Sequence, residues 1–367
     1  MKITVEKEEL QKKLSDIQNI VEKKNTRPIL SHFLLIADKT GNYIMATDLE
    51  TAFKEPIDLT VINEGRVCLP AKKLFEIVRE LEGTLTLEAT DNQWFKGKAG
   101  KSNFRIACLS PDEFPVWPSL EGAEGIEIPS QMLLEMIDKT LYAAGESETR
   151  YVLNGLLFHL QKEGLFTIVG TDGHRLAISL KKAGTALKED LKVIVSRKSV
   201  AELRKFLSDD DTKTVKIDIG KNHILFGIDR IQFLTRLIDG NYPNYEQVIP
   251  TANEQVVIVD RIALTKSLRR VSTMSRERSN AVKVEINAGN TVVSASNPDL
   301  GEIKDEFDVE YSGEQMTFAF NARYMLEVLN AMSTEKVIFK LNEALSPALM
   351  LEEGKEDYKC VIMPMRL

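Results

Sequence analysis

The chain has 367 residues and a formal net charge of -7, from 48 Lys and Arg against 55 Asp and Glu. A hydrophobic content of 43% and a charged content of 28% are those of an ordinary soluble globular protein. No stretch approaches the roughly 18 uninterrupted apolar residues of a membrane span, and Met1–Val5 lacks the apolar core of a signal peptide. The composition therefore counts against a membrane protein and a generally basic nucleic-acid binder, and it predicts a cytoplasmic protein.

The predicted elements follow one order three times along the chain. Each copy begins with an amphipathic helix, continues with strand-like runs, enters a second helix and closes with alternating strands. The first helices are predicted at Glu6–Lys23, Ser130–Ala144 and Asp260–Met274, with Ser130 and Asp260 as N-caps. The second helices are predicted at Ala71–Leu81, Lys198–Leu207 and Arg323–Met332.

Strands are predicted between and after these helices. They include His32–Ala37, Tyr43–Thr47, Thr84–Ala89, Asn103–Leu109, Leu156–His159, Phe166–Gly170, Val282–Ile286 and Thr291–Ala295. This order of elements predicts an α+β unit with two helices and an antiparallel sheet.

Two short segments recur at a nearly constant offset and show that the three copies are repeats. Pro70, Ser196 and Asn321 stand at equivalent strand-to-helix junctions, 126 and 125 residues apart. A turn recurs as Thr47-Asp48, Thr171-Asp172 and Ser296-Asn297, in steps of 124 and 125 residues. Two anchors with one period predict three tandem domains, which we place at residues 1–124, 125–251 and 252–367.

The three cysteines, Cys68, Cys108 and Cys360, are far apart and lie outside any C-x-x-C or Cys/His cluster. This spacing predicts neither a disulfide framework nor a metal site. No cofactor fingerprint occurs elsewhere, so we expect no cofactor.

Basic residues gather on the predicted helices although the chain as a whole is acidic. Asp260–Arg278 carries six basic residues against two acidic ones, and smaller basic clusters recur in the other copies. These clusters are Lys23, Lys24 and Arg27; Lys72, Lys73 and Arg79; and Arg197, Lys198, Arg204 and Lys205. Equivalent helices of a symmetric array point the same way, so their charges would add into one surface suited to phosphates. Any single helix of this kind could instead have only a solvated face.

Neither an interleaved aromatic platform for bases nor an isolated recognition helix occurs, which leaves sequence-independent contact with a duplex backbone. Five motifs in order make the chain resemble the bacterial DNA sliding clamps, the beta subunits of the replicative DNA polymerase, and the resemblance covers the full length. The motifs are Tyr151-Val152-Leu153-Asn154-Gly155, Thr171-Asp172-Gly173-His174-Arg175-Leu176, Pro243-Asn244-Tyr245, Phe320-Asn321-Ala322-Arg323-Tyr324 and Val361-Ile362-Met363-Pro364-Met365-Arg366-Leu367.

The resemblance implies a head-to-tail homodimeric ring without enzymatic activity, which encircles double-stranded DNA and tethers the polymerase. It implies DNA contacts at Lys24, Arg150, Tyr151 and Lys198, with Val152 in place of a second expected tyrosine. It also implies a groove between copies two and three that captures linear motifs of the polymerase, the clamp loader and repair proteins. The residues implied for this groove are Leu153, Thr171, Gly173, His174, Arg175, Leu176, Pro243, Val248, Asn321, Tyr324, Met363, Pro364, Met365, Arg366 and Leu367.

Charge on the two end copies suggests how such a dimer would join. Lys96, Lys98, Lys101 and Arg105 lie along one predicted edge of copy one, with Phe104 among them. Copy three offers Asp299, Glu302, Asp305, Glu306, Asp308 and Glu310, with Lys304 as the one cation. Opposite charge steers such edges together, and the resemblance adds Thr273 and Met274 opposite Phe104. The alternative is two unrelated solvated edges.

A size estimate also favours two chains. If two helices per copy line a hole at a spacing of about 9.5 Å, two chains leave an opening of about 26 Å, and one chain only about 8 Å. A duplex whose grooves are each about 8 Å deep fits the larger opening and not the smaller.

Two other classes of protein stay open. Asp172 beside His174 could form the acid–base pair of a hydrolase, but no nucleophile elbow, P-loop or metal-binding motif accompanies them, and the recurrence of the turn favours a structural role. A protein-only scaffold would keep the repeats but would have no use for the basic helices.

Overall fold

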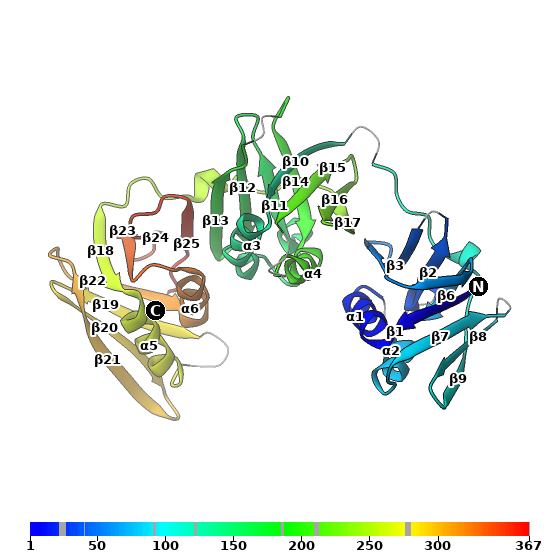
Figure 1. The fold of residues 1–367 in the computed structure, drawn as a ribbon. Helices are drawn as coiled ribbons and strands as arrows, with labels where there is room; N and C mark the ends of the chain where they lie inside the picture. Colours follow the sequence, from blue (N-terminus) through cyan, green and yellow to red (C-terminus); the bar gives the residue numbers. More distant parts are fainter. Residues whose placement is uncertain are drawn as a thin grey trace. The chain divides into compact units, whose positions relative to one another are not determined.

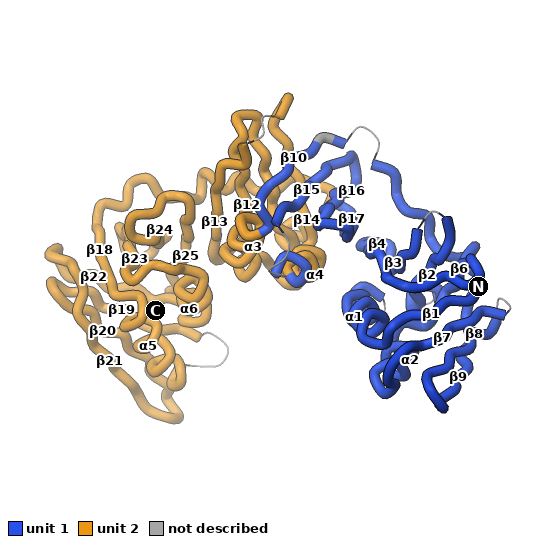
Figure 2. The backbone as a smooth tube through the Cα atoms, viewed as in Figure 1, with its two compact units in different colours: residues 1–130, 205–237 blue, residues 131–204, 238–367 orange. Residues whose placement is uncertain are grey.

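A computed structural model describes residues 1–21, 27–39, 41–90, 93–120, 123–184, 187–208, 213–275 and 280–366. The chain divides into two compact units, each made of two separate stretches of sequence (Figure 2). Unit 1 contains residues 1–130 and 205–237, and unit 2 contains residues 131–204 and 238–367. The middle copy of the repeat therefore contributes strands to both units.

Each copy carries its two predicted helices. They are α1 (Lys7–Ile17), α2 (Ala71–Arg79), α3 (Ser130–Asp138), α4 (Arg197–Leu207), α5 (Arg261–Ser272) and α6 (Ala322–Ala331). Asp260 is the predicted N-cap of α5, since its carboxylate accepts the amide of Ala263 at 2.6 Å. The prediction for Ser130 is wrong, because this residue is already the first of α3 and is fully buried.

Two predicted helices are longer than the observed ones. Glu6–Lys23 was expected to be one helix, but α1 ends at Ile17. Helix α3 ends at Asp138, and a separate 3-10 turn follows at Leu141–Ala143. The buried hydroxyl of Thr140 donates a hydrogen bond to the carbonyl of Met136 at 2.7 Å. A side chain thus satisfies a carbonyl of the last turn of α3.

Unit 1 has two antiparallel sheets. The first runs β5-β1-β7-β8-β9, from Thr60–Asn63, Lys2–Glu6, Thr84–Ala89, Trp94–Ala99 and Ser102–Ala107. The second runs β6-β2-β3-β4-β17-β16-β15-β10, from Gly65–Pro70, His32–Asp38, Gly41–Thr47, Thr51–Pro56, Ile231–Ile238, His223–Ile228, Thr214–Ile219 and Glu124–Pro129. The pairing of β4 with β17 joins strands of the first and second copies.

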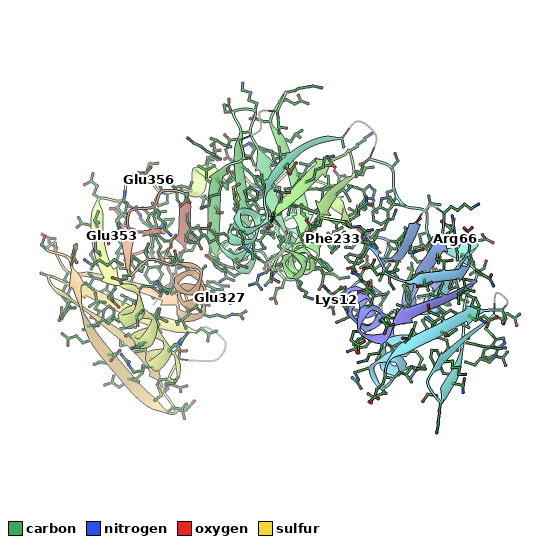
Figure 3. All side chains as sticks on the ribbon, viewed as in Figure 1. Lys12, Arg66, Phe233, Glu327, Glu353 and Glu356 are labelled. Atoms are coloured by element: carbon green, nitrogen blue, oxygen red, sulfur yellow. The ribbon has the colours of Figure 1, made fainter. Side chains whose placement is uncertain are left out.

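Aromatic packing strengthens that junction. Phe53 of β4 stacks on Phe206 of α4 with ring centroids 4.8 Å apart. Phe233 of β17, labelled in Figure 3, lies 5.9 Å from the same Phe206 ring and 6.4 Å from Phe226. These pairs have the tilted or offset geometry that aromatic side chains prefer.

Unit 2 repeats this arrangement. Its longer sheet runs β14-β11-β12-β13-β25-β24-β23-β18, from Leu191–Ser196, Gly155–Leu160, Leu165–Thr171, Arg175–Lys182, Tyr358–Ile362, Ala348–Glu352, Lys336–Leu341 and Gln255–Asp260. The other sheet runs β22-β19-β20-β21, from Met316–Asn321, Ala281–Asn287, Asn290–Asn297 and Gly301–Glu310. Helices α5 and α6 pack against these strands (Figure 1).

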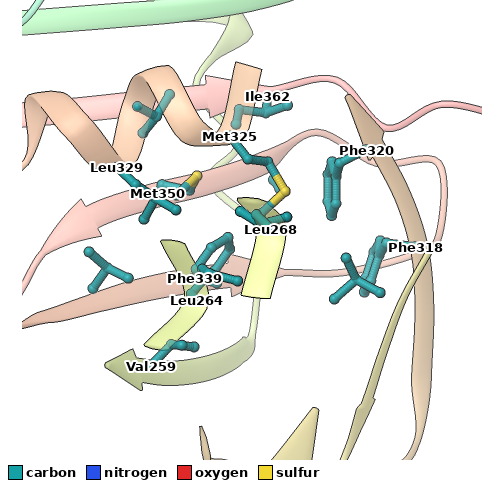
Figure 4. Close-up of a cluster of buried hydrophobic side chains, with 14 of the residues drawn as sticks. Val259, Leu264, Leu268, Phe318, Phe320, Met325, Leu329, Phe339, Met350 and Ile362 are labelled. Atoms are coloured by element: carbon teal, nitrogen blue, oxygen red, sulfur yellow. The ribbon is translucent and has the colours of Figure 1, made fainter. Parts of the chain in front are cut away.

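The core of copy three lies between α5, α6 and the surrounding strands. Leu264 and Leu268 of α5 and Met325 and Leu329 of α6 share one buried cluster with Phe318, Phe320, Phe339, Met350 and Ile362 (Figure 4). The helical residues are spaced four apart, as one apolar face requires. Among the described helices, none combines the length and the apolar character that a membrane span needs.

Candidate functional site

The turn between β12 and β13 is built by side chains that bond to its own backbone. The hydroxyl of Thr171 donates to the carbonyl of Arg175 at 2.5 Å and accepts the amide of Gly173 at 3.1 Å. One carboxylate oxygen of Asp172 accepts the amides of His174 and Arg175 at 2.9 and 3.0 Å. Gly173 has a φ of +88°, a conformation that glycine adopts without strain. The residues Thr-Asp-Gly thus fix the shape of the turn.

Arg175 ties this turn to the rest of unit 2. Its side chain is almost fully buried and pairs with Asp172 at 3.1 Å and with Glu327 of α6, labelled in Figure 3. It also donates to the carbonyl of Tyr142 at 2.5 Å and lies over the Tyr324 ring at 4.3 Å. A guanidinium can hold all these partners at once because it has five donors and two flat faces.

The pairing of β13 with β25 creates an apolar floor beside the turn. Leu176 stands opposite Val361, and both belong to a buried cluster with Leu157, Val169, Ile178, Tyr245 and Leu349. Because side chains alternate along a strand, Cys360 and Ile362 on either side of Val361 face the other core. The terminal strand therefore supplies both a core and a surface.

An apolar groove of about 170 Å³ lies over this floor. It is lined by predicted groove residues and by three further ones. The predicted residues are Leu153, Thr171, Gly173, Arg175, Leu176, Pro243, Val248 and Met363, and the further ones are Arg150, Tyr245 and Val361. Tyr245 and Val361 belong to two of the motifs quoted above. The alternation of side chains along a strand could have identified Val361 as a groove residue.

Other predicted groove residues lie beside the groove. The ring of His174 stacks loosely on that of Tyr324, with centroids 6.5 Å apart, and the amide of Met363 donates to the carbonyl of His174 at 2.9 Å. Asn321 caps α6 by accepting the amides of Arg323 and Tyr324. Pro364 and Met365 are partly buried and Arg366 is exposed, while Leu367 is outside the described residues.

Three of the four predicted DNA contacts are described residues of unit 2. Lys24 falls outside the described residues. Tyr151 is 59% exposed on the 3-10 turn Tyr151–Asn154, and Lys198 is exposed on α4. Arg150 lines the groove, since a Cβ added at Gly173 would meet its Nη2 atom at 2.6 Å.

Several basic residues of the helices carry acidic partners. Arg197 pairs with Glu146 at 2.8 Å, Arg204 pairs with Asp138, and Lys73 pairs with Glu76 at 2.6 Å. The pairs reduce the positive field of these helices without removing their donors. Arg276 and Arg278 lie outside the described residues.

The two predicted dimer edges are outer strands of their sheets. Within the described residues, β9 pairs only with β8, and Gly301–Asp308 of β21 pairs only with β20. Lys96 and Arg105 stand directly opposite each other, and Arg105 lies over the Trp94 ring at 3.8 Å. The Phe104 ring covers Gly97, where a Cβ would approach it to 2.0 Å.

The acidic edge has two faces with different surroundings. Glu302, Lys304, Glu306 and Asp308 are exposed on one face of β21, and Asp299 is exposed before the strand. Asp305 lies on the other face, where a hydrogen bond from Arg270 lowers the pKa of its carboxyl group. Thr273 is exposed at the end of α5, and Met274 packs against the core.

The chain matches three successive family models. Residues 1–118 match the DNA polymerase III beta subunit N-terminal domain, residues 127–244 its central domain, and residues 246–366 its C-terminal domain. A curated relative from Pseudomonas putida named beta sliding clamp is 33% identical over 369 residues, with 100% of both chains covered. Two crystal structures from Pseudomonas aeruginosa, the DNA polymerase III subunit beta and a DnaN sliding clamp bound to griselimycin, each match with a TM-score of 0.95, 32% identity and 100% coverage of both chains.

Proposed function

The chain belongs to the DNA polymerase III beta subunit family and acts as a sliding clamp that makes a DNA polymerase processive, and we propose that two copies close head to tail around duplex DNA. In this proposal the ring holds DNA without reading its sequence and without catalysis, in the cytoplasm. We further propose that the three clamp domains span residues 1–124, 125–251 and 252–367.

The proposal of a head-to-tail dimer rests on the edge strands β9 and β21, which lack a second partner strand over most of their length within the described residues. Within the chain, β4 pairs with β17 and β13 pairs with β25, both antiparallel. Strand β21 holds the same place in copy three as β4 and β13 in their copies, and β9 holds the place of β17 in copy one. A second chain that supplies β9 to β21 would complete the same pairing, and a contact of this kind closes into a ring when each chain contributes a half turn.

Charge favours the same pairing. The cations Lys96 and Arg105 repel each other across β8 and β9, and like charges directly opposite destabilise a sheet. An incoming acidic strand with Glu302 and Asp308 would relieve that repulsion and would steer the two ends together. Asp299, Lys101, Phe104, Asp305, Thr273 and Met274 are the other residues that we assign to this interface.

The dimer is tested by reversing charge on the basic edge. A double variant Lys101→Glu and Arg105→Glu should sediment as a monomer in analytical ultracentrifugation and lose retention on closed circular DNA. The control Lys221→Glu with Arg230→Glu changes two exposed cations of the same unit by the same charge, and it should remain a dimer. Dimers that persist in the first variant contradict the interface.

Topological binding to DNA is tested separately. We propose loose contacts from Lys24, Arg150, Tyr151 and Lys198 to the phosphates. A loaded ring should stay on closed circles and run off linear DNA with free ends, because only the circle has no end. Equal retention on both would contradict the ring, and binding to neither would favour the protein-only scaffold.

We propose that the apolar groove captures short linear motifs of the polymerase, the clamp loader and repair proteins. Its floor of Leu176 and Val361 is rigid because both belong to paired strands, and Met363 offers an adaptable rim that can repack around different side chains. Rim contacts are assigned to His174, Asn321, Tyr324, Pro364, Met365, Arg366 and Leu367.

Removal of the terminal residues tests the groove. Deleting Met363–Leu367 should abolish calorimetric binding of a peptide from the polymerase tail and leave the dimer intact, since these residues follow β25. Peptide affinity that survives the deletion would contradict this assignment.

A further inference from the structure

The Arg175 side chain in the wall of the groove is held by partners from three separate elements. Its Nε atom donates to Asp172 of its own turn at 3.1 Å, and its Nη2 atom donates to the carbonyl of Tyr142 in the 3-10 turn Leu141–Ala143 at 2.5 Å. Its Nη1 atom pairs with the carboxylate of Glu327 on α6. Since Arg175 is only 7% exposed, these contacts decide where the planar guanidinium stands in the wall.

Helix α6 holds the guanidinium from two sides. The Cζ atom of Arg175 lies over the Tyr324 ring, 4.3 Å from its centre, and the Glu327 carboxylate meets its Nη1 edge. Tyr324 and Glu327 are three residues apart, so they lie on the same face of the helix. Asn321 fixes the start of this helix by accepting the amides of Arg323 and Tyr324. The slot that receives Arg175 is therefore built by α6.

Glu327 itself does not belong to the lining of the groove, and the resemblance did not assign it there. Its other carboxylate oxygen accepts the Nε atom of the exposed Arg323 at 3.1 Å. Of the two arginines that it contacts, Arg175 lines the groove and Arg323 does not. An effect of Glu327 on a peptide in the groove is therefore expected to pass through Arg175.

The first copy shows the same carboxylate without the arginine. Glu76 holds the position in α2 that Glu327 holds in α6, six residues after the junction between strand and helix. It pairs with Lys73 of its own helix at 2.6 Å. The residue of copy one that is equivalent to Arg175 is Thr51, which carries no charge. The hollow beside Thr51 has about 60 Å³, compared with about 170 Å³ for the groove. The pairing of helix and turn thus accompanies the larger space.

We propose that Glu327 is a positioning residue of the groove, which holds the Arg175 guanidinium in the wall that a partner's linear motif contacts. This inference rests on the proposed function of the groove and adds a residue that lies outside it. Without this carboxylate, Arg175 would keep Asp172 and Tyr142 but lose the partner of its Nη1 atom. The wall would then have to be ordered when a peptide binds, and ordering at that moment lowers affinity.

The variant Glu327→Gln tests the proposal, because it removes the charge and keeps the shape of the side chain. A peptide of the polymerase tail should bind this variant about three- to tenfold more weakly in fluorescence anisotropy, an effect between those of an exposed and a buried ion pair. A purely structural role predicts no such change, since a moderate loss of stability leaves nearly all of the chain folded. Hydrogen exchange of the β24 amides reports whether unit 2 is folded.

Two control variants locate the effect. Arg323→Gln removes the other partner of Glu327, and Glu76→Gln makes the same substitution at the equivalent position of α2. Both should bind the peptide as the wild-type chain does.

Three results would overturn the proposal. They are unchanged peptide affinity in Glu327→Gln, an equal loss of affinity in Arg323→Gln, and a loss in Glu327→Gln that is accompanied by complete loss of protection in β24. Failure of the peptide to bind the wild-type chain would count against the groove itself, and this inference would fall with it.

Discussion

The turns at residues 47–51 and 171–175 have the same backbone and different surroundings. In unit 1, Thr47 and Asp48 make four hydrogen bonds to the turn, between 2.7 and 3.1 Å long. Thr171 and Asp172 make the same four bonds in unit 2. The third copy keeps one of them, from the amide of Asp299 to Asn297 at 3.0 Å. The shape of the turn is therefore a structural feature of the repeat and does not by itself indicate a function.

The side chains around the two turns decide what each turn can do. Ala52 opposite Leu234 replaces Leu176 opposite Val361, and Leu49 replaces Gly173. The hollow in unit 1 has about 60 Å³, compared with about 170 Å³ for the groove. The two hollows thus differ in lining residues and in volume, while the strand pairing beneath them is the same.

Two buried carboxylates extend the comparison. Glu55 in unit 1 pairs with Lys13 at 2.5 Å, and Glu352 in unit 2 pairs with Lys139 at 2.8 Å. Burial raises the pKa of Glu55 to about 7 despite Lys13, and its second oxygen has no partner within the described residues. Burial also opposes ionisation of Glu352, but hydrogen bonds from Lys139 and Ser333 lower its pKa to about 2. The number of donors, and not the presence of a lysine, separates the two sites.

Removal of the lysine from each pair should have the largest effect on the free energy of unfolding. Lys139→Met leaves Glu352 ionised in a closed site, and breaking such a buried pair costs about 3–5 kcal/mol. Lys13→Met should cost less, because Glu55 can take up a proton near neutral pH. Hydrogen exchange of the amides of β24 and β4 would measure each loss in its own unit. Equal losses in the two units would contradict the role given to the extra donors.

Substitution of Arg175 and of Thr51, the equivalent residues at the ends of the two turns, should have the next largest effect. Arg175→Thr removes a cation shared by Asp172 and Glu327, and because Glu327 is partly exposed we expect a loss of about 2–3 kcal/mol. Peptide binding in the groove should fall with it, since the turn loses its tie to α6. Thr51→Val in unit 1 is the matched change at the equivalent residue, and it should leave peptide binding unaffected by calorimetry. Unchanged binding by Arg175→Thr would show that the turn holds the groove without this side chain.

The turns also show how far sequence reasoning reaches. The period of the repeat, the helices and the strands that flank them follow from local patterns, because each copy must form the same units to bury its own core. Leu153, Leu176 and Val248 were assigned to the groove from the resemblance alone, and the structure places all three in its lining.

The rest depends on contacts between residues far apart in the chain. That Arg175 meets Glu327, 152 residues away, cannot be read from spacing. The division of the middle copy between two compact units likewise arises from the pairing of β4 with β17, and no local signal marks it. Arg150 was assigned to DNA and lines the groove as well, because the shape of its turn is set by tertiary contacts.

A change of pH should alter the stability contributions of Glu55 and Glu352 in opposite directions. The folded pKa of Glu55 lies above its ordinary value of 4.5, so its contribution to stability is complete below pH 4.5 and is lost as the pH rises toward 7. The folded pKa of Glu352 lies below 4.5, so its contribution is present above pH 4.5 and is lost as the pH falls toward 2. Each contribution is about 2 kcal/mol on the scale of 1.4 kcal/mol per pKa unit, after allowance for incomplete burial.

Uncharged variants test how the stability of each unit depends on pH. Glu55→Gln should remove the loss of stability of unit 1 between pH 5 and 7, and Glu352→Gln should remove the loss of unit 2 below pH 4.5. Exchange rates of β4 and β24 amides, corrected for the intrinsic effect of pH, give both slopes. A slope of the same sign at both sites would contradict the opposite pKa shifts.

The smallest effects should come from exchanging the residues at the positive-φ positions of the two turns. Leu49 has a φ of +76°, and Gly173 has a φ of +88°. Gly173→Leu should cost about 1–2 kcal/mol in strain, while its Cβ displaces only the flexible end of Arg150. A leucine there also occupies the groove, so the free energy of peptide binding should fall by more than the free energy of unfolding.

Leu49→Gly removes the strain but gives the unfolded chain more freedom, so its net effect on the free energy of unfolding should stay within about 0.5 kcal/mol. It should create no peptide site in unit 1, because Phe114, Val116 and Trp117 still line the small hollow there. Calorimetry with the polymerase-tail peptide, at one site per chain before and after Leu49→Gly, checks this. A second binding event would mean that the side chain at the turn alone had closed the hollow of unit 1.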